Sequence, residues 1–259
     1  MIRNDLHVHS IRSLCGFHTI LEITEIAAKK GMRSVNICDH GKASGKKIKF
    51  DVFNNKDRFP RTIQSHQGNT ITILTGIEVN ILDIEGNSDL PQEQACNFDL
   101  ISAGFHSMAK DLASGKSLQS NTQALRNYLN RFPLDILTHP CIATFPLDID
   151  IVVSLAVKYG FALEVNNTKL RLNKTDVGKL KDMIDLAIEK GAALTENSDG
   201  HTIDEIGENE QIEKLLKSMG LNGNDVFFNR NDKLLYEFLE ERKKARDSQH
   251  PYGRFSEES

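Results

Sequence analysis

Seven short runs of apolar and β-branched residues alternate with longer segments of helical periodicity along the chain. These runs are Arg3–His9, Ser34–Cys38, Thr70–Ile77, Asp99–Phe105, Asp135–Thr138, Ala162–Val165 and Ala192–Thr195. Strands that alternate with helices pair in parallel, because each helix returns the chain to the same end of the sheet. The sequence therefore predicts an α/β fold with a largely parallel sheet.

Residues that start and stop helices flank several of the intervening segments. Thr19 and Glu22 have the spacing of a capping box, and Gly31 closes the segment that follows. Asp148 and Gly160 bracket a second helix in the same way. Gly191 ends a third, which begins near residue 175. These helices are predicted from local chemistry as well as from periodicity.

The chain has no Pro/Gly/Ser-rich linker and no internal repeat. Its 259 residues are 39% hydrophobic and 26% charged, which suits one large core-forming domain. Asn231 is placed to cap a last amphipathic helix, after which the sequence turns polar. We therefore expect one domain over residues 1–242 and a flexible polar tail over residues 243–259.

Charge and cysteine content restrict the partners and the compartment. The formal net charge of −4 gives no overall attraction to nucleic acid or to an anionic membrane, so a small substrate is expected. The four cysteines lack a CxxC spacing, and no apolar run reaches the roughly 20 residues of a membrane span. The sequence thus predicts a soluble, cytoplasmic protein and gives no indication of its oligomeric state.

Histidines and carboxylates gather at the ends of the predicted strands. His7 and His9 are two apart in an extended run, so their side chains share one face. The later strands are followed by Asp39, His40, Glu78, His106, His139, Asp199 and His201. In a parallel barrel these positions converge on one rim. A single such histidine could equally well be an ordinary core or surface residue as a member of a functional site. Six histidines at strand ends indicate a shared site.

Imidazole and carboxylate are the ligands that borderline cations such as Zn²⁺ accept. One cation could be shared by His7, His9, Glu78 and Asp199. Glu78 has two oxygens and could bridge to a second cation, which His106 and His139 would hold. His40 and His201 would suit a third.

Seven motifs resemble those of the PHP phosphoesterases, the polymerase and histidinol phosphatase family, and within it the small YcdX-type bacterial phosphatases. They are Asp5-Leu-His-Val-His9, Cys38-Asp-His-Gly41, Gly76-Ile-Glu-Val-Asn80, Ala103-Gly-Phe-His106, Thr138-His-Pro140, Leu163-Glu-Val-Asn-Asn167 and Ser198-Asp-Gly-His201. The resemblance covers nearly the whole chain. It implies a distorted seven-stranded (β/α)7 TIM-like barrel with two or three Zn²⁺ or Mn²⁺ ions, held by the ligand sets given above, and hydrolysis of phosphate esters.

One position departs from the resemblance. YcdX-type relatives carry a histidine eight residues after the first ligand, where this chain has Cys15, with His18 three residues beyond. Cys15 could ligate as a thiolate, His18 could replace it, or the third metal could be weak or absent. A thiolate would favour zinc over manganese because sulfur is the softer donor. Cys15 is equally well a small buried hydrophobe.

The expected chemistry is attack on a phosphomonoester by a hydroxide that bridges metal ions. Glu78 and Asp199 would organise that centre, and His201 or Asp39 could protonate the leaving oxygen. Asp5 lies on the same strand face as His7 and His9 and could accept an N–H from a ligand imidazole, with a structural ion pair as the alternative. For the substrate phosphate, the candidates are a basic segment over residues 41–58 and Arg12, Lys169 and Arg171.

Three other functions stay open at this level. A 3′–5′ exonuclease is the nearest alternative, since the same family includes polymerase-associated domains. A lactonase or amidase of the amidohydrolase kind would also use a barrel and an HxH pair, although such enzymes typically bridge their metals with a lysine. A non-catalytic metal-binding protein is the third, and the ligand set, which is altered only at the Cys15 position, speaks against it.

Overall fold

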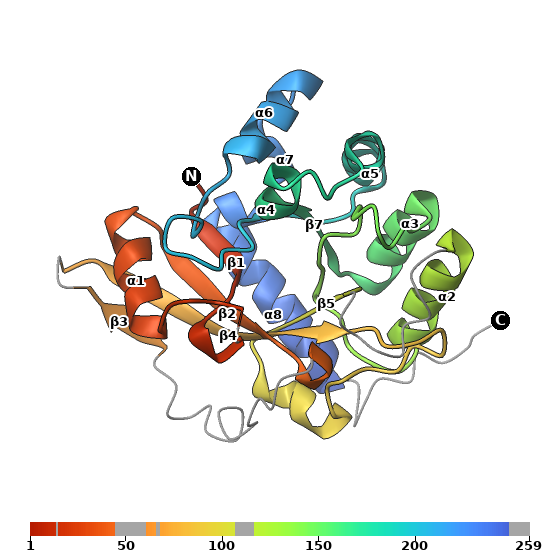
Figure 1. The fold of residues 1–259 in the computed structure, drawn as a ribbon, viewed down its shortest axis with the longest axis horizontal. Helices are drawn as coiled ribbons and strands as arrows, with labels where there is room; N and C mark the ends of the chain where they lie inside the picture. Colours follow the sequence, from red (N-terminus) through yellow and green to blue (C-terminus); the bar gives the residue numbers. More distant parts are fainter. Residues whose placement is uncertain (14, 45–60, 66–67, 107–116, 249–259) are drawn as a thin grey trace.

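A sheet of seven parallel strands forms the centre of the molecule (Figure 1). The computed structural model describes residues 1–13, 15–44, 61–65, 68–106 and 117–248. The parallel strands are β1 (Asn4–Val8), β2 (Ser34–His40), β4 (Thr70–Asn80), β5 (Leu100–Gly104), β6 (Ile136–Leu137), β7 (Ala162–Asn166) and β8 (Leu194–Asn197). They are neighbours in that order, which confirms the predicted parallel α/β arrangement.

The two outer strands of this series approach each other and nearly close the sheet into a barrel. Val8 and Gly200 form a parallel bridge, and the His9 N–H donates to the Gly200 carbonyl at 2.9 Å. The Leu6 N–H donates instead to the Asn197 side chain at 3.0 Å. The seam is thus partly made by side chains, and the expected distorted seven-stranded barrel is confirmed.

One further strand was not expected from the sequence. Strand β3 (Thr62–Gln64) pairs antiparallel with the start of β4. Its three residues are exposed or half-buried, so they show no apolar alternation that would mark a strand.

The predicted helix boundaries are confirmed where capping residues marked them. Helix α1 (Ile20–Lys29) begins with the Thr19–Glu22 capping box. Helices α3 (Ile149–Tyr159) and α5 (Val177–Lys190) end at Gly160 and Gly191, both in the left-handed conformation that glycine adopts without strain. The remaining elements before the last helix are α2 (Leu118–Leu129), α4 (Asn167–Arg171), α6 (Glu210–Met219), α7 (Gly223–Val226) and 3₁₀ turns at Ile11–Ser13, Lys42–Ser44, Gln92–Asn97 and Phe228–Arg230. Within the described chain, no helix is both long enough and apolar enough to cross a membrane.

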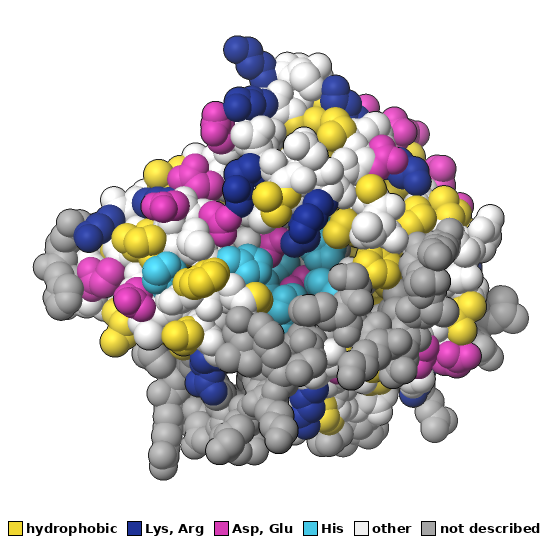
Figure 2. Space-filling view, in the orientation of Figure 1, with side chains coloured by type: hydrophobic (Ala, Val, Ile, Leu, Met, Phe, Trp, Pro, Cys, Tyr) yellow, Lys and Arg dark blue, Asp and Glu magenta, His cyan; other side chains and the backbone are white. Residues whose placement is uncertain are grey.

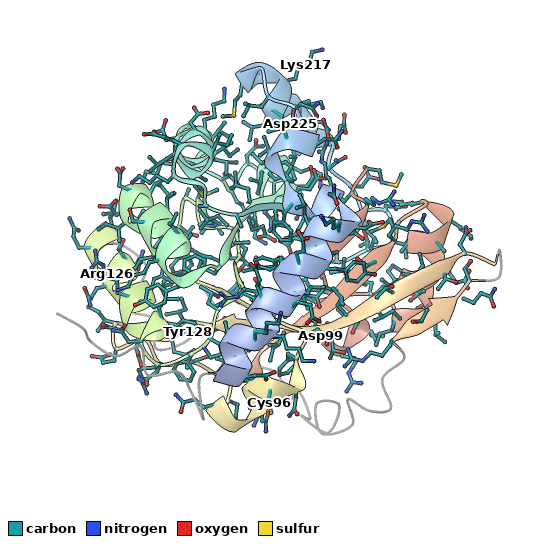
Figure 3. All side chains as sticks on the ribbon, turned by 180° about the vertical axis from the view of Figure 1, so that it is seen from behind. Cys96, Asp99, Arg126, Tyr128, Lys217 and Asp225 are labelled. Carbon is teal, nitrogen blue, oxygen red and sulfur yellow. The ribbon has the colours of Figure 1, made fainter. Side chains whose placement is uncertain are left out.

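Helix α8 (Asp232–Ser248) covers the back of the barrel, as Figure 3 shows. The Asn231 side chain caps it as predicted, because its Oδ1 accepts the N–H groups of Lys233 and Leu234 at 2.9 and 3.3 Å. Leu235 and Phe238 pack in one buried cluster with apolar residues from the barrel strands, namely Leu6, Leu74, Leu100, Ile136 and Ala162. The back of the barrel is therefore an apolar plug, which leaves the opposite end for polar side chains.

This helix continues through residues 243–248, which the sequence assigned to the tail. The continuation is stabilised by Arg242 and Arg246, which both bind the fully buried carboxylate of Asp135. Arg246, one of the charged residues that made this segment look solvated, thus has a buried partner far away in the chain. Residues 249–259 of the predicted tail and residues 45–58 of the predicted basic segment lie outside the described residues.

Candidate metal centre

Histidine side chains line a hollow on the face of the molecule opposite α8 (Figure 2). The hollow lies at the carboxyl ends of the parallel strands, where the sequence placed its candidate ligands. Parallel pairing of β2 with β4 sets His40 and Glu78 side by side as register partners. Both residues belong to the strands themselves, whereas the sequence pattern had placed them after the strand ends.

The first predicted ligand set converges around one point. His7 Nε2 lies 3.0 Å from His9 Nε2, and both nitrogens face the same carboxylate oxygens. Glu78 Oε2 is 3.3 and 3.5 Å from them, and Asp199 Oδ1 is 3.6 and 3.4 Å away. All four side chains are at most 1% exposed.

The second predicted set meets the other oxygen of the same glutamate. Glu78 Oε1 lies 3.2 Å from His106 Nε2 and 3.3 Å from His139 Nε2, and these two nitrogens are 3.1 Å apart. Glu78 thus presents one oxygen to each set, which is the arrangement expected of a carboxylate that bridges two cations.

These spacings fit the requirements of a metal ion. Nitrogen or oxygen ligands bound at about 2.0–2.1 Å in a tetrahedron lie roughly 3.3 Å from one another. Two facing imidazole nitrogens can share one proton at most, whereas a cation accepts a lone pair from each. Among the described residues, His139 Nδ1 is buried without a hydrogen-bond partner. His40 Nδ1 lies 3.0 Å from Glu78 Oε2. The donor set is therefore suited to cations.

The third group brings Cys15 to the position left open by the sequence. The Cys15 thiol, His9, His40 and His201 each offer a ligand atom within 4.8 Å of the others. Among the described residues, His18 belongs to no such group. The structure thus favours Cys15 over His18 as the partner of His40 and His201, while ligation itself stays a prediction.

Charges inside the hollow compensate one another. Burial opposes ionisation of Glu78, but His106, His7 and His40 together hold its pKa well below the usual range. Burial also opposes a Cys15 thiolate, yet hydrogen bonds with His201 and His40 lower the pKa of that thiol to about 5. Glu78 and Cys15 are therefore held in their anionic forms near neutral pH.

Three polar residues outside the predicted ligand sets orient the imidazoles. Glu164 Oε1 accepts the Nδ1–H of His7 at 2.7 Å, and Asn80 Oδ1 accepts that of His106 at 2.8 Å. Each bond leaves the Nε2 lone pair facing the cluster. Ser13 Oγ lies 3.1 Å from His9 Nδ1 and 3.2 Å from the Cys15 sulfur. Glu164 belongs to the motif Leu163-Glu-Val-Asn-Asn167, but the sequence does not reveal its role, because a buried acidic residue on a strand has several possible partners.

The expectation for Asp5 is wrong in its partner. Its carboxylate binds the backbone N–H groups of His7, Ser198 and Gly207 and the Ser198 hydroxyl, at the seam between β1 and β8. No imidazole is among these contacts, because Glu164 already occupies His7 Nδ1. Burial raises the pKa of Asp5 to about 6.

Asp39 and His201 were the candidate proton donors. Both oxygens of Asp39 accept bonds from Ser10, one from its N–H and one from its hydroxyl, each at 2.7 Å. Asp39 therefore anchors the loop after β1. The His201 ring is 25% exposed, and its Nδ1 lies 2.9 Å from the Asp199 carbonyl. Of the two, His201 is the one open to the hollow, and the role of each as an acid stays a prediction.

Two of the three non-glycine residues with positive φ in the described chain, His139 and Asp199, are candidate ligands, and the third is Asn173. His139 and Asp199 have φ values of 34° and 53°, in the left-handed region that non-glycine residues seldom adopt. Such strain persists only where the surroundings impose it, and it is often found at functional sites. At both positions it aims a ligand side chain into the hollow.

A sequence-family model described as the PHP domain matches residues 5–142, more than half of the chain. The chain belongs to the PHP family. A probable phosphatase of Aeromonas hydrophila is 31% identical over 242 residues, which cover 93% of this chain and 95% of that protein. Another from Thermoanaerobacter sp. is 30% identical, with the same coverage of both chains. The PHP resemblance drawn from the motifs is thereby confirmed.

Solved structures support the fold of this PHP protein. The histidinol phosphate phosphatase from Lactococcus lactis, complexed with Zn, L-histidinol and phosphate, aligns with a TM-score of 0.58 at 14% identity, over 85% of this chain and 94% of that chain. A chain in a structure of archaeal ribonuclease P with mature tRNA aligns with a TM-score of 0.54 at 12% identity, over 92% and 91%. At these identities the likeness concerns the barrel alone.

Proposed function

We propose that this PHP protein is a metal-dependent phosphatase that hydrolyses phosphomonoesters of small molecules at a centre of two or three Zn²⁺ or Mn²⁺ ions. The curated relatives that span nearly the whole chain are probable phosphatases, which supports this reaction class. The single observation that carries the proposal is Glu78, whose two oxygens face His7 and His9 on one side and His106 and His139 on the other.

The side chains divide into ligands and residues that hold them. His7, His9, Glu78 and Asp199 would hold one ion, and Glu78, His106 and His139 a second. Cys15, His40 and His201 would hold a third. When bound, such ions make water a nucleophile at neutral pH and neutralise charge on the phosphoryl group. Glu164 and Asn80 fix the imidazole tautomers, and His201 is the proposed proton donor to the leaving oxygen.

The reaction class is tested by turnover of p-nitrophenyl phosphate by the purified chain, supplied with Zn²⁺ or Mn²⁺ in separate assays. We expect hydrolysis that a chelator abolishes and that added metal restores. Faster turnover of lactones or amides would indicate an amidohydrolase-like enzyme. Degradation of labelled single-stranded DNA that is lost in His9→Ala would indicate an exonuclease.

Acid should remove the ions and the activity together. Burial disfavours a charged His40, but Glu78 and Cys15 raise its pKa to about 10, so without a bound ion this imidazole carries a proton at neutral pH. Binding must expel that proton, so metal affinity increases with pH and is lost as pH falls. We expect bound metal and kcat/KM to decline together as the pH is lowered, and to be lost below roughly pH 6, where ordinary imidazoles among the other proposed ligands also take up protons. Full activity with retained metal at pH 5 would contradict this expectation.

Cys15 should give the third site a thiolate donor. A cobalt-loaded protein should then show a sulfur-to-metal charge-transfer band in the near ultraviolet, which Cys15→Ser removes. His18→Ala is the matched control and should keep the band, since His18 lies outside the ligand groups of the described residues. A band that survives Cys15→Ser would show that Cys15 is not a ligand.

A further inference from the structure

Lys169 is a charged side chain at the candidate metal centre that belongs to none of the ligand sets. It lies on the short helix α4, directly after β7, and its backbone N–H donates to Asn166 Oδ1 at 2.8 Å. The Asn166 amide in turn donates to Glu164 at 3.0 Å and to Asp199 at 3.2 Å. The base of the Lys169 side chain is therefore held by the same network that positions the candidate ligands.

The ammonium group of Lys169 forms an ion pair with Asp199 Oδ2. The other oxygen, Oδ1, faces His7 and His9 at 3.6 and 3.4 Å. Lys169 therefore approaches Asp199 from outside the proposed ligand cluster. Its side chain is 17% exposed, whereas Asp199 is 1% exposed, so the positive charge lies between the buried ligands and solvent.

A neighbouring cation on the same helix is differently engaged. Arg171 is ion-paired with Glu205, and its side chain is 45% exposed. It thus points to the outer rim, while Lys169 points to the ligands. Figure 2 shows basic side chains at the border of the histidine-lined hollow. Of the two cations on α4, Lys169 is therefore the one placed to meet a charged group that enters there.

A lysine ammonium has three donors on a flexible stem, so it can keep one bond to a carboxylate and donate another to an incoming oxygen. A phosphomonoester brings two negative charges to a hollow that already contains Glu78, Glu164 and Asp199, whereas a diester brings one. We propose that Lys169 binds the phosphoryl group of the substrate and favours dianionic monoesters over monoanionic diesters. This inference rests on the proposed phosphatase function.

The test compares Lys169→Met and Lys169→Arg with the wild-type chain in its metal-loaded form. Binding of inorganic phosphate is measured by calorimetry, and metal content by elemental analysis. We expect Lys169→Met to weaken phosphate binding at least about ten-fold, the size expected for loss of one charge-assisted hydrogen bond, with unchanged metal content. Lys169→Arg should restore part of it. Lys214→Met, which removes an exposed ion pair with Glu210, is the matched control and should bind phosphate normally.

Kinetics provide the second measurement. We expect Lys169→Met to lower kcat/KM for p-nitrophenyl phosphate more than for bis(p-nitrophenyl) phosphate. Unchanged phosphate affinity in both variants, equal losses on the two esters, or loss of metal in Lys169→Met would overturn the inference, the last because Lys169 would then only support Asp199. If the wild-type chain hydrolyses neither ester, the proposed function fails by itself, and the phosphate isotherms still decide the role of Lys169.

Discussion

Replacing Glu78 by alanine should reduce kcat/KM for a phosphomonoester by more than about 100-fold, beyond the usual cost of losing an outer partner of a metal ligand. Glu78 is 1% exposed, and its two oxygens face two different pairs of imidazoles at 3.2–3.5 Å. Removing it would therefore weaken two ion sites at once and take away the carboxylate that faces His106 and His139. Steady-state kinetics with metal analysis of the same samples would measure both effects.

His40→Ala is the matched comparison, since His40 is the register partner of Glu78 on the neighbouring strand. It is proposed to contribute to the third site alone, so its loss should cost less activity than the loss of Glu78. Circular dichroism of both variants would establish that the barrel is retained. A larger loss in His40→Ala would contradict the bridging role of Glu78.

Replacing Asp135 by alanine should lower the free energy of unfolding by about 3–5 kcal/mol, as expected when one partner of a buried ion pair is removed. Asp135 is fully buried and precedes β6, at the end of the barrel opposite His139. Arg242 Nε donates to it at 3.0 Å, Arg246 forms a second ion pair, and the Ile101 N–H donates at 2.8 Å. Its loss would leave two largely buried guanidinium groups of α8 without their carboxylate partner. Urea denaturation would measure the resulting decrease in the free energy of unfolding.

Asp232→Ala provides the control for that measurement. Asp232 is the first residue of α8 and is ion-paired with Arg3 at 2.7 Å. Both side chains are about two-fifths exposed, at 39% for Asp232 and 44% for Arg3. Exposed pairs contribute at most about 1 kcal/mol. Equal destabilisation in the two variants would mean that the Asp135 network does not anchor α8.

Much of the fold could be predicted because local chemistry marks its elements. Thr19, Asp148 and Asn231 cap helices in the structure as the sequence indicated. Strand β3 and the end of α8 could not be predicted in this way. The first has no apolar alternation, and the second depends on Asp135, which lies 107 residues from Arg242 in the chain.

The candidate site follows from one geometric rule, that parallel strands end on the same rim. That rule brings His7, Glu78 and His139 together although they are far apart in the sequence. The rule does not determine which buried group each ligand side chain hydrogen-bonds on the side away from the hollow. For this reason the sequence does not reveal that His7 bonds to Glu164 and not to Asp5, since the seam that places Ser198 beside Asp5 forms only in the folded barrel.

Backbone conformation at the ligands is a second feature that the sequence does not reveal. His139 and Asp199 adopt positive φ angles that would ordinarily indicate glycine. Local propensity disfavours both, so the conformation must be imposed by the surrounding fold. Local sequence preferences therefore fail at the two residues where the proposed function requires an unusual backbone.

The central claim is that Glu78 joins two cation sites in one centre. Elemental analysis of the purified, dialysed chain tests it most directly. We predict at least two tightly bound transition-metal ions per chain in the wild type and a marked loss in Glu78→Ala. Less than one ion per chain after incubation with Zn²⁺ or Mn²⁺ would contradict a multinuclear centre.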